Sequence, residues 1–318
     1  MTGRGHVLRL RRIGRNVSDL ARAIAFYCDA LGFSLIGESP TNDPAWSGLM
    51  DIPGVRAHAA TLRLGEEEIE FTAFDPPGRA YPPQSGSTDL WFQHIAIVVT
   101  DMEAAHAKLC RHAFTAITEG DPQRLPPNTG SVTAFKFRDP DGHPLELLHF
   151  PPGTGDTCWQ RKRGVFLGID HSAIAVAYTA ESIDFYTRLL GFRVAGRSLN
   201  SGVEQARLDH APDVRVNVVA LEPVEAHTPH VELLGYEQPT GRPLPAGVKP
   251  NDIIADRLVL DVDDLPRLVQ ILEAENVTFI SPGTVTSNDG RRSALVRDPT
   301  GHLLLFTQAV RTRAVMTS

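Results

Sequence analysis

The chain has little that would support a disulfide framework, a membrane span or a secretory leader. Its 318 residues include three cysteines, Cys28, Cys110 and Cys158, without Cys-x-x-Cys spacing. This excludes the disulfide-rich class and favours a reducing cytoplasm. No apolar run approaches the roughly 20 residues of a membrane helix, and the opening MTGRGHVLRL lacks the apolar stretch of a signal peptide. We therefore expect a cytoplasmic protein that does not enter the membrane.

Motifs for nucleotide cofactors and for covalent catalysis are also missing. The sequence contains no glycine-rich phosphate loop, no dinucleotide-binding fingerprint and no nucleophile elbow. The formal net charge of −7 argues against nucleic acid or anionic membranes as partners. Hydrophobic residues make up 42% of the chain and charged residues 22%, which is ordinary for a soluble globular protein. The length is sufficient for two domains.

What the chain does contain is a repeat. FYCDALGF at residues 26–33 returns as FYTRLLGF at 185–192, and HIAIVVTD at 94–101 has its counterpart in RLVLDVDD at 257–264. DPDGH at 139–143 matches DPTGH at 298–302, and both have strong turn chemistry. Each half of the chain therefore contains two rounds of a similar unit.

The hydrophobic pattern predicts the elements of each unit. Short strands are expected at 13–17 and 174–176, followed by helices with apolar faces over 20–31 and 183–190 that end at Gly32 and Gly191. Further helices are expected at 102–111 and 265–275, and short β-like segments follow each helix. We predict an α+β protein of four βαβββ modules, with halves at 1–152 and 164–310 joined by a Pro/Gly-rich linker at 153–163.

Four such modules, with FY…LGF, HIAIVV-x-D and FRDPDGHPLEL, resemble the vicinal oxygen chelate superfamily. This family includes glyoxalase I, extradiol dioxygenases, methylmalonyl-CoA epimerase and the fosfomycin- and bleomycin-resistance proteins. The resemblance covers about residues 7–308 and identifies the fold rather than the reaction. It implies that each module curls into a half-barrel and that a pair of modules encloses a cleft.

The resemblance also implies where metal ligands would stand, on the first and last strands of each module. Carried onto this chain, the first-strand positions are Arg12, His94, His171 and Arg257, and the last-strand positions are Glu70, Glu146, Glu232 and Leu305. If each half closed its own cleft, both clefts would contain an arginine, which has no lone pair to donate.

If modules two and three share a cleft instead, that cleft holds a full ligand set. The set is His94, Glu146, His171 and Glu232. Modules one and four would then share a cleft without a credible metal site, containing Arg12, Glu70, Arg257 and Leu305. Because glyoxalase-like members build their sites between domains or subunits, we predict one metal site, and we expect Arg12 or Arg257 to pair with Glu70.

Two imidazoles and two carboxylates suit one divalent ion of Ni, Co, Zn, Mn or Fe, with Glu146 or Glu232 as general base. The leading prediction is a glyoxalase-like lyase or isomerase acting on a small molecule that chelates the metal through adjacent oxygens. Two alternatives stay open, an extradiol-type dioxygenase and a non-catalytic small-molecule binding or resistance protein. Internal duplication makes a monomer plausible, and a homodimer is the other possibility.

Several further positions receive weaker predictions. His143 and His302 are interpreted as turn residues rather than ligands. His230 lies two residues before Glu232 and should share its strand face, either beside the ligands or in surface packing. The stretches 124–130 and 236–252 form either the mouth of the cleft or plain surface linkage.

Overall fold

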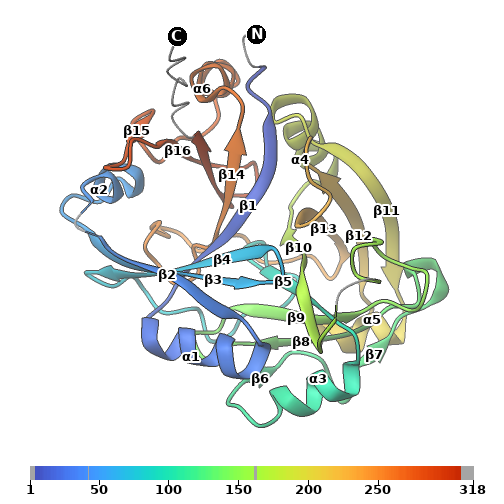
Figure 1. The fold of residues 1–318 in the computed structure, drawn as a ribbon. Coiled ribbons are helices and arrows are strands. Elements are labelled where there is room, and N and C mark those ends of the chain that lie inside the picture. Colours follow the sequence, from blue (N-terminus) through green and yellow to red (C-terminus); the bar gives the residue numbers. More distant parts are fainter. Residues whose placement is uncertain (1–3, 42, 161–162, 309–318) are drawn as a thin grey trace, which may run out of the picture.

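The protein consists of two large curved sheets (Figure 1). Each sheet combines one module from the first half of the chain with one module from the second half. The computed structural model describes residues 4–41, 43–160 and 163–308. Residues 161–162 of the predicted linker and 309–310 at the predicted end of the second half lie outside this description. The mixed α+β class is confirmed.

The first sheet joins modules one and four in the order β15-β16-β17-β14-β1-β4-β3-β2. Its strands are β1 (Val7–Asn16), β2 (Ser34–Thr41), β3 (Arg56–Leu64), β4 (Glu67–Asp75), β14 (Arg257–Val262), β15 (Val285–Thr286), β16 (Arg292–Arg297) and β17 (Leu303–Gln308). The two modules meet where β1 pairs antiparallel with β14, seen in Figure 1 as a blue strand beside an orange one.

The second sheet joins modules two and three in the order β11-β12-β13-β10-β5-β9-β8-β6, with β7 paired to β8. Its strands are β5 (Gln93–Val99), β6 (Thr115–Ala116), β7 (Gln123–Arg124), β8 (Thr133–Arg138), β9 (Pro144–His149), β10 (Phe166–Ala175), β11 (Arg193–Ser201), β12 (Arg215–Glu222) and β13 (His230–Gln238). Here β5 pairs antiparallel with β10. The predicted pairing of modules two with three and one with four is therefore confirmed.

Six α-helices accompany the sheets in the described residues. They are α1 (Leu20–Leu31), α2 (Ala45–Met50), α3 (Met102–Leu109), α4 (Thr179–Asp184), α5 (Val203–Asp209) and α6 (Leu265–Ala274). A π-helical turn, Phe185–Leu189, continues α4, and a 3₁₀ turn covers Pro127–Thr129. None of the described helices is both long and apolar enough to cross a membrane.

The predicted helix over 20–31 is confirmed by its ends. The Asp19 side chain accepts from the backbone N–H of Arg22, and Gly32 closes the helix in the left-handed region at φ 77°. The helices predicted at 102–111 and 265–275 end one or two residues early, within the usual variation of helix ends. The expected helix over 183–190 is corrected, since the α-helix covers Thr179–Asp184 and the π-helical turn covers Phe185–Leu189.

The opening strands are longer than the pattern predicted. Strand β1 begins at Val7 rather than at residue 13, and β10 begins at Phe166 rather than at 174. Both strands contain β-bulges, located between Leu10 and Arg12 and between Ile169 and His171. A bulge inserts one residue and breaks the alternation of apolar and polar side chains, so the pattern hides the strand.

Each sheet separates a core face from a cleft face. In β5, Ile95 and Ile97 belong to the main core cluster, whereas His94 lines a cavity on the opposite face. Side chains that are two residues apart share a face of a strand. The concave face of each sheet is therefore where chemistry can be placed.

Candidate metal centre

The four predicted ligands meet on the concave face of the second sheet. His94 comes from β5, Glu146 from β9, His171 from β10 and Glu232 from β13. The central pair β5 and β10 places His94 opposite Ala173, which is itself level with Glu232 on β13. The four positions therefore converge where modules two and three join, and we call this space the His94 cleft.

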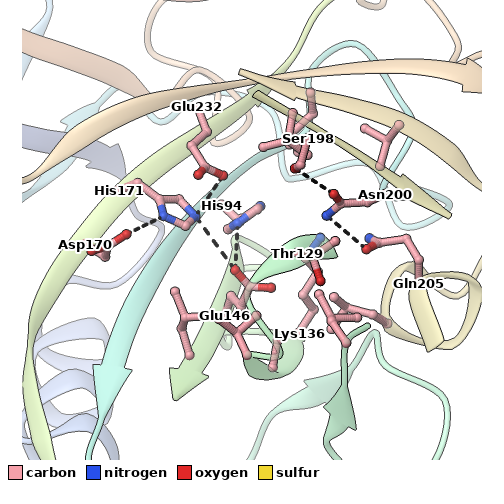
Figure 2. A pocket seen from close by; sticks show the side chains of 18 of the residues that line it. His94, Thr129, Lys136, Glu146, Asp170, His171, Ser198, Asn200, Gln205 and Glu232 are labelled. Carbon is pink, nitrogen blue, oxygen red and sulfur yellow. Dashed lines mark hydrogen bonds and ion pairs between the residues drawn. The ribbon is translucent and has the colours of Figure 1, made fainter. Parts of the chain in front are cut away.

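Both imidazoles lie between the two carboxylates (Figure 2). His94 Nε2 is 3.2 Å from Glu146 Oε2, while His171 Nε2 is 3.8 Å from Glu146 Oε2 and 3.5 Å from Glu232 Oε2. His94, Glu146 and His171 are buried and present ligand atoms that all lie within 4.8 Å of one another. Glu232 has 20% of its side chain exposed, and its other oxygen lies 3.6 Å from His230 Nε2.

The electrostatics of this group favour a cation. Burial raises the pKa of Glu232, but the nearby His171 and His230 outweigh it and lower the pKa to about 2. Burial likewise raises the pKa of Glu146, but His94 and Lys136 outweigh it and lower it. Two ionised carboxylates thus face a buried space, and a buried charge of this kind requires a counter-charge.

Two buried imidazole nitrogens in the group, His94 Nδ1 and His171 Nε2, have no hydrogen-bond partner in the described structure. His171 Nε2 is the one that lies near both carboxylates. Burial lowers the pKa of His171, but Glu232 and the hydrogen-bonded Asp170 outweigh it and raise it to about 9, so the site favours positive charge at this imidazole. A divalent ion bonded to Nε2 would supply that charge and satisfy the orphaned nitrogen, and so the residues present fit a metal.

Asp170 fixes the orientation of His171. Its Oδ2 accepts from His171 Nδ1 at 3.0 Å and its Oδ1 accepts from Trp159 Nε1 at 2.7 Å. A carboxylate on the far nitrogen sets the tautomer that leaves Nε2 free for a metal. Sequence reasoning missed both partners, because the bulge in β10 turns Asp170 to the cleft side and Trp159 lies in the predicted linker.

A polar network beside the ligands was also missed. Lys136 Nζ donates to Asp209 Oδ1 at 2.6 Å, and Gln205 Nε2 and Tyr236 OH donate to Asp209 Oδ2 at 2.8 and 3.1 Å. Asn200 donates in turn to Gln205 Oε1 at 3.3 Å. Lys136, Asn200, Gln205 and Tyr236 line a cavity of about 170 Å³ together with the ligands and several apolar side chains. A signal existed for Lys136 alone, since it is the charged residue in the apolar stretch before the DPDGH turn.

The structure also places the other histidines and the two loops for which the sequence made predictions. His143 and His302 are buried in their turns, with Nε2 hydrogen-bonded to the carbonyls of Asn16 and Ala175, so their interpretation as turn residues is confirmed. His230 lies beside Glu232, as its strand position predicted. The stretch 124–130 contributes Leu125 and Thr129 to the cavity, whereas 236–252 contributes Tyr236.

The first sheet has its own concave cavity, which we call the Arg12 cleft. Arg12 Nη1 lies 3.0 Å from Glu70 Oε2, and Arg257 Nη2 lies 2.9 Å from Glu70 Oε1. The predicted pairing is confirmed and extends to both arginines. Burial raises the pKa of Glu70, but Arg257 and Arg12 outweigh it and lower the pKa below its ordinary value. Leu305 replaces the fourth ligand with an apolar wall.

A family model and a protein of Escherichia coli both match this chain. The family model described as Glyoxalase/Bleomycin resistance protein/Dioxygenase superfamily matches the chain twice, over residues 8–147 and 168–306. A relative described as uncharacterized protein YaeR of Escherichia coli (strain K12) is 35% identical over 133 residues, which is 41% of this chain and 87% of that protein.

Solved structures share the fold over nearly the whole chain. Glyoxalase I from Zea mays superposes with a TM-score of 0.60 at 16% identity, covering 94% of this chain and 92% of the maize chain. A putative dioxygenase from Bacillus subtilis superposes with a TM-score of 0.58 at 14% identity, covering 96% of this chain and 86% of the other. At these identities the likeness concerns the fold alone.

Proposed function

Because the chain belongs to the glyoxalase/bleomycin resistance protein/dioxygenase superfamily, we propose that it is a metal-dependent enzyme with one active site, in the His94 cleft. The observation that carries this proposal is the buried group of His94, Glu146 and His171, with His171 Nε2 lacking a partner. These residues, together with Glu232, would hold one divalent ion of Ni, Co, Zn, Mn or Fe. When bound, the ion would act as a Lewis acid on adjacent oxygens of a substrate.

The two glutamates differ in what they can do. Glu146 is 6% exposed, its oxygen is hydrogen-bonded to His94, and its strand partner across β8 and β9 is Lys136. Glu232 has 20% of its side chain exposed at the edge of the group. We infer that Glu146 is a fixed ligand and that Glu232 is the general base. On an α-hydroxycarbonyl compound it would take the proton from the carbon that bears the hydroxyl group and return it to the carbonyl carbon, while the hydroxyl proton passes to the former carbonyl oxygen, which is an isomerisation.

The cavity defines the class of substrate. Its volume of about 170 Å³ is below the range typical of drug-sized ligands, which favours a compact molecule. Burial lowers the pKa of Lys136, but Asp209 and Glu146 outweigh it and raise the pKa, so the amine stays protonated beside Glu146. A small hydroxycarbonyl or dicarbonyl compound in the cytoplasm would suit this space, with its oxygens toward the histidines and its other end against the polar network.

The test begins with the metal content of native protein by elemental analysis. We expect about one equivalent in the unmodified protein, and His94→Ala or His171→Ala should remove it. Glu70→Gln, the matched glutamate of the Arg12 cleft, should keep it. Folded protein without any transition metal would contradict the proposal and would favour the binding-protein alternative.

The second step measures proton transfer directly. A panel of small α-hydroxy ketones and 1,2-dicarbonyls is incubated in deuterated water, and the exchange of the hydrogen beside the carbonyl is followed by NMR. Glu232→Gln at saturating metal should slow the exchange by about 100-fold or more. Equal exchange rates in the variant and the unmodified protein would rule out Glu232 as the base.

One observation supports a second candidate, an extradiol-type dioxygenase. The tight group is two histidines and one carboxylate, the ligand set of non-haem Fe(II) oxygenases. In this case Glu232 would remain outside the ligand shell. Oxygen uptake by Fe(II)-loaded protein with a panel of catechols distinguishes the two functions, because the isomerase consumes no oxygen.

A further inference from the structure

The larger of the two concave cavities is the Arg12 cleft. It encloses about 670 Å³, compared with about 170 Å³ in the His94 cleft. This volume lies within the range of small-molecule binding sites. A cleft that had lost its function and kept only a structural role would be expected to fill with side chains, since protein interiors pack closely.

The cleft walls correspond position by position to those of the His94 cleft. The bulge in β1 turns both Arg11 and Arg12 into the cavity, as the bulge in β10 does for Asp170 and His171. The positions of Asp170 and His171 in the His94 cleft are therefore occupied by Arg11 and Arg12 in the Arg12 cleft. The sign of the charge presented to the cavity is reversed.

Three guanidinium groups lie around the Glu70 carboxylate at the ligand positions. Arg11, Arg12 and Arg257 all lower its pKa against the effect of burial. Arg12 also lies 4.0 Å from Glu68, and Arg11 lies 3.4 Å from Asp261. Burial lowers the pKa of Arg11 and the neighbouring Arg12 lowers it further, which outweighs the effect of Asp261. The Nε–H groups of all three arginines are buried without an acceptor.

The guanidinium groups are accessible from the cavity. Arg11 has 26% of its side chain exposed and Arg12 has 17%, and Arg291 adds a third cation at 29%. Arg11 lies 3.4 Å from Asp261, and Arg291 lies 4.0 Å from Asp261 and 3.8 Å from Asp289, so these ion pairs are longer than the Arg12–Glu70 pair at 3.0 Å.

The carboxylates at the mouth are engaged elsewhere. Asp43 accepts from the backbone N–H groups of Ala45 and Asn288, and Asp289 accepts from Ser287 and from the backbone N–H of Arg291.

Part of the cavity lining is apolar and aromatic. Leu49, Leu305 and Val259 are buried in one cluster at its floor, and the Trp46 ring lies on one wall with the Arg257 guanidinium 5.3 Å from its centre. An apolar floor beside a group of cations matches an organic molecule with one charged end.

We propose that the Arg12 cleft is a metal-independent binding site for a small organic oxyanion, a carboxylate or phosphate monoester, with the oxyanion at Arg11 and Arg12. Planar guanidinium groups bind both oxyanions in a bidentate manner. The apolar part of the ligand lies against Trp46 and Leu305. This site is separate from the proposed active site and does not depend on its metal.

The test is a titration with three fluorinated probes followed by ¹⁹F NMR. The probes are 4-fluorobenzoate, 4-fluorophenyl phosphate and the neutral 4-fluorobenzamide, each added to metal-loaded and to chelator-treated full-length protein. We expect both anions to bind, equally in the two preparations, and the amide to bind at least about tenfold more weakly. The tighter of the two anions identifies whether a carboxylate or a phosphate is preferred.

Two variants form a matched pair. Arg9 and Arg11 both contact Asp261, but Arg9 is exposed and does not line the cavity. Arg11→Gln should weaken binding by about tenfold, whereas Arg9→Gln should change it less than about twofold. Both substitutions leave Glu70 and its partners intact, so the fold should be retained.

Three results would overturn the proposal. They are the absence of saturable binding by either anion, equal weakening by Arg9→Gln and Arg11→Gln, and loss of anion binding in His94→Ala while Arg11→Gln still binds. The last result would place the anion in the His94 cleft. The metal assay above is independent of all three, so the two proposals can fail separately.

Discussion

Replacing Glu70 by glutamine should destabilise the protein strongly without affecting its metal. The carboxylate bridges two guanidinium groups, at 3.0 Å from Arg12 and 2.9 Å from Arg257, and Arg257 is fully buried. Removing one partner of a buried ion pair typically costs 3–5 kcal/mol because the remaining charge loses its counterion. Arg257 keeps its hydrogen bonds to Asn16 and Thr72, and the Arg12 side chain is 17% exposed. We therefore expect the lower end of the range, about 3 kcal/mol.

Urea unfolding at neutral pH measures this effect. With a slope of about 3 kcal/mol per molar, the midpoint should fall by about 1 M. The matched control is Glu237→Gln, whose ion pair with Arg215 is about half exposed on both sides and should leave the midpoint unchanged. Metal content should stay at one equivalent in both variants.

The same urea unfolding experiment is repeated at acidic pH. Because the folded pKa of Glu70 is lowered, its contribution to the free energy of unfolding is fully present above the ordinary carboxylate pKa. The contribution is lost as the pH falls through the folded pKa. The gap between the unmodified protein and Glu70→Gln should therefore shrink in acid. A gap that is independent of pH, or no larger than that of Glu237→Gln, would refute the reasoning.

Two further substitutions test how the clefts are supported. Asp170→Asn should weaken metal binding by about 10–100-fold in competition with a chelating dye, because the amide is a poorer acceptor for His171 Nδ1, and an unchanged affinity would contradict that role. Gly14→Ala should lower the free energy of unfolding by about 1–3 kcal/mol, because a Cβ there would lie 2.7 Å from the Arg257 side chain. Ala173 occupies the matching place in the other sheet, so a stability loss for Ala173→Gly as large as that for Gly14→Ala would argue against this explanation.

The architecture and the convergence of the four candidate positions on one cleft could be predicted because both depend on strong, repeated signals. The recurrence of FY…LGF and of the DP-x-GH turn is visible in the letters, and it fixes the module count. The module pairing followed from chemistry, since an arginine among metal ligands is incompatible with a site. The helix over 20–31 was readable because its capping residues, Asp19 and Gly32, are local.

What could not be predicted depends on local geometry or on distant partners. Asp170 and Arg11 reach their clefts because a bulge inserts a residue, and alternation alone would place them on the opposite face. Lys136 meets Asp209 from 73 positions away, through a short helix, α5, that the pattern did not reveal. Trp159 looked like linker because a Pro/Gly-rich setting gives no indication of a buried indole. The periodicity of a single strand or helix carries no information about such contacts between residues that are distant in the sequence.

The substitutions that distinguish the Arg12 cleft from the His94 cleft compensate for one another in size. This argues against the independent loss of single ligand residues. Where His94 faces Ala173 across β5 and β10, Arg257 faces Gly14 across β14 and β1. The larger arginine needs the space that the absent Cβ leaves.

The same adjustment applies to charge. In the Arg12 cleft, arginines stand at both positions that hold histidines in the His94 cleft, which brings two positive charges close together. The retained Glu70 lies between Arg12 and Arg257 and bonds to both. In the His94 cleft, carboxylates around two imidazoles attract a cation. In the Arg12 cleft, the guanidinium groups of Arg11 and Arg12 line a wide cavity at the positions that Asp170 and His171 occupy in the other cleft. Under the two proposals, a single scaffold would hold a cation on one concave face and an oxyanion on the other, and the substitutions in each cleft match the charge of its ligand.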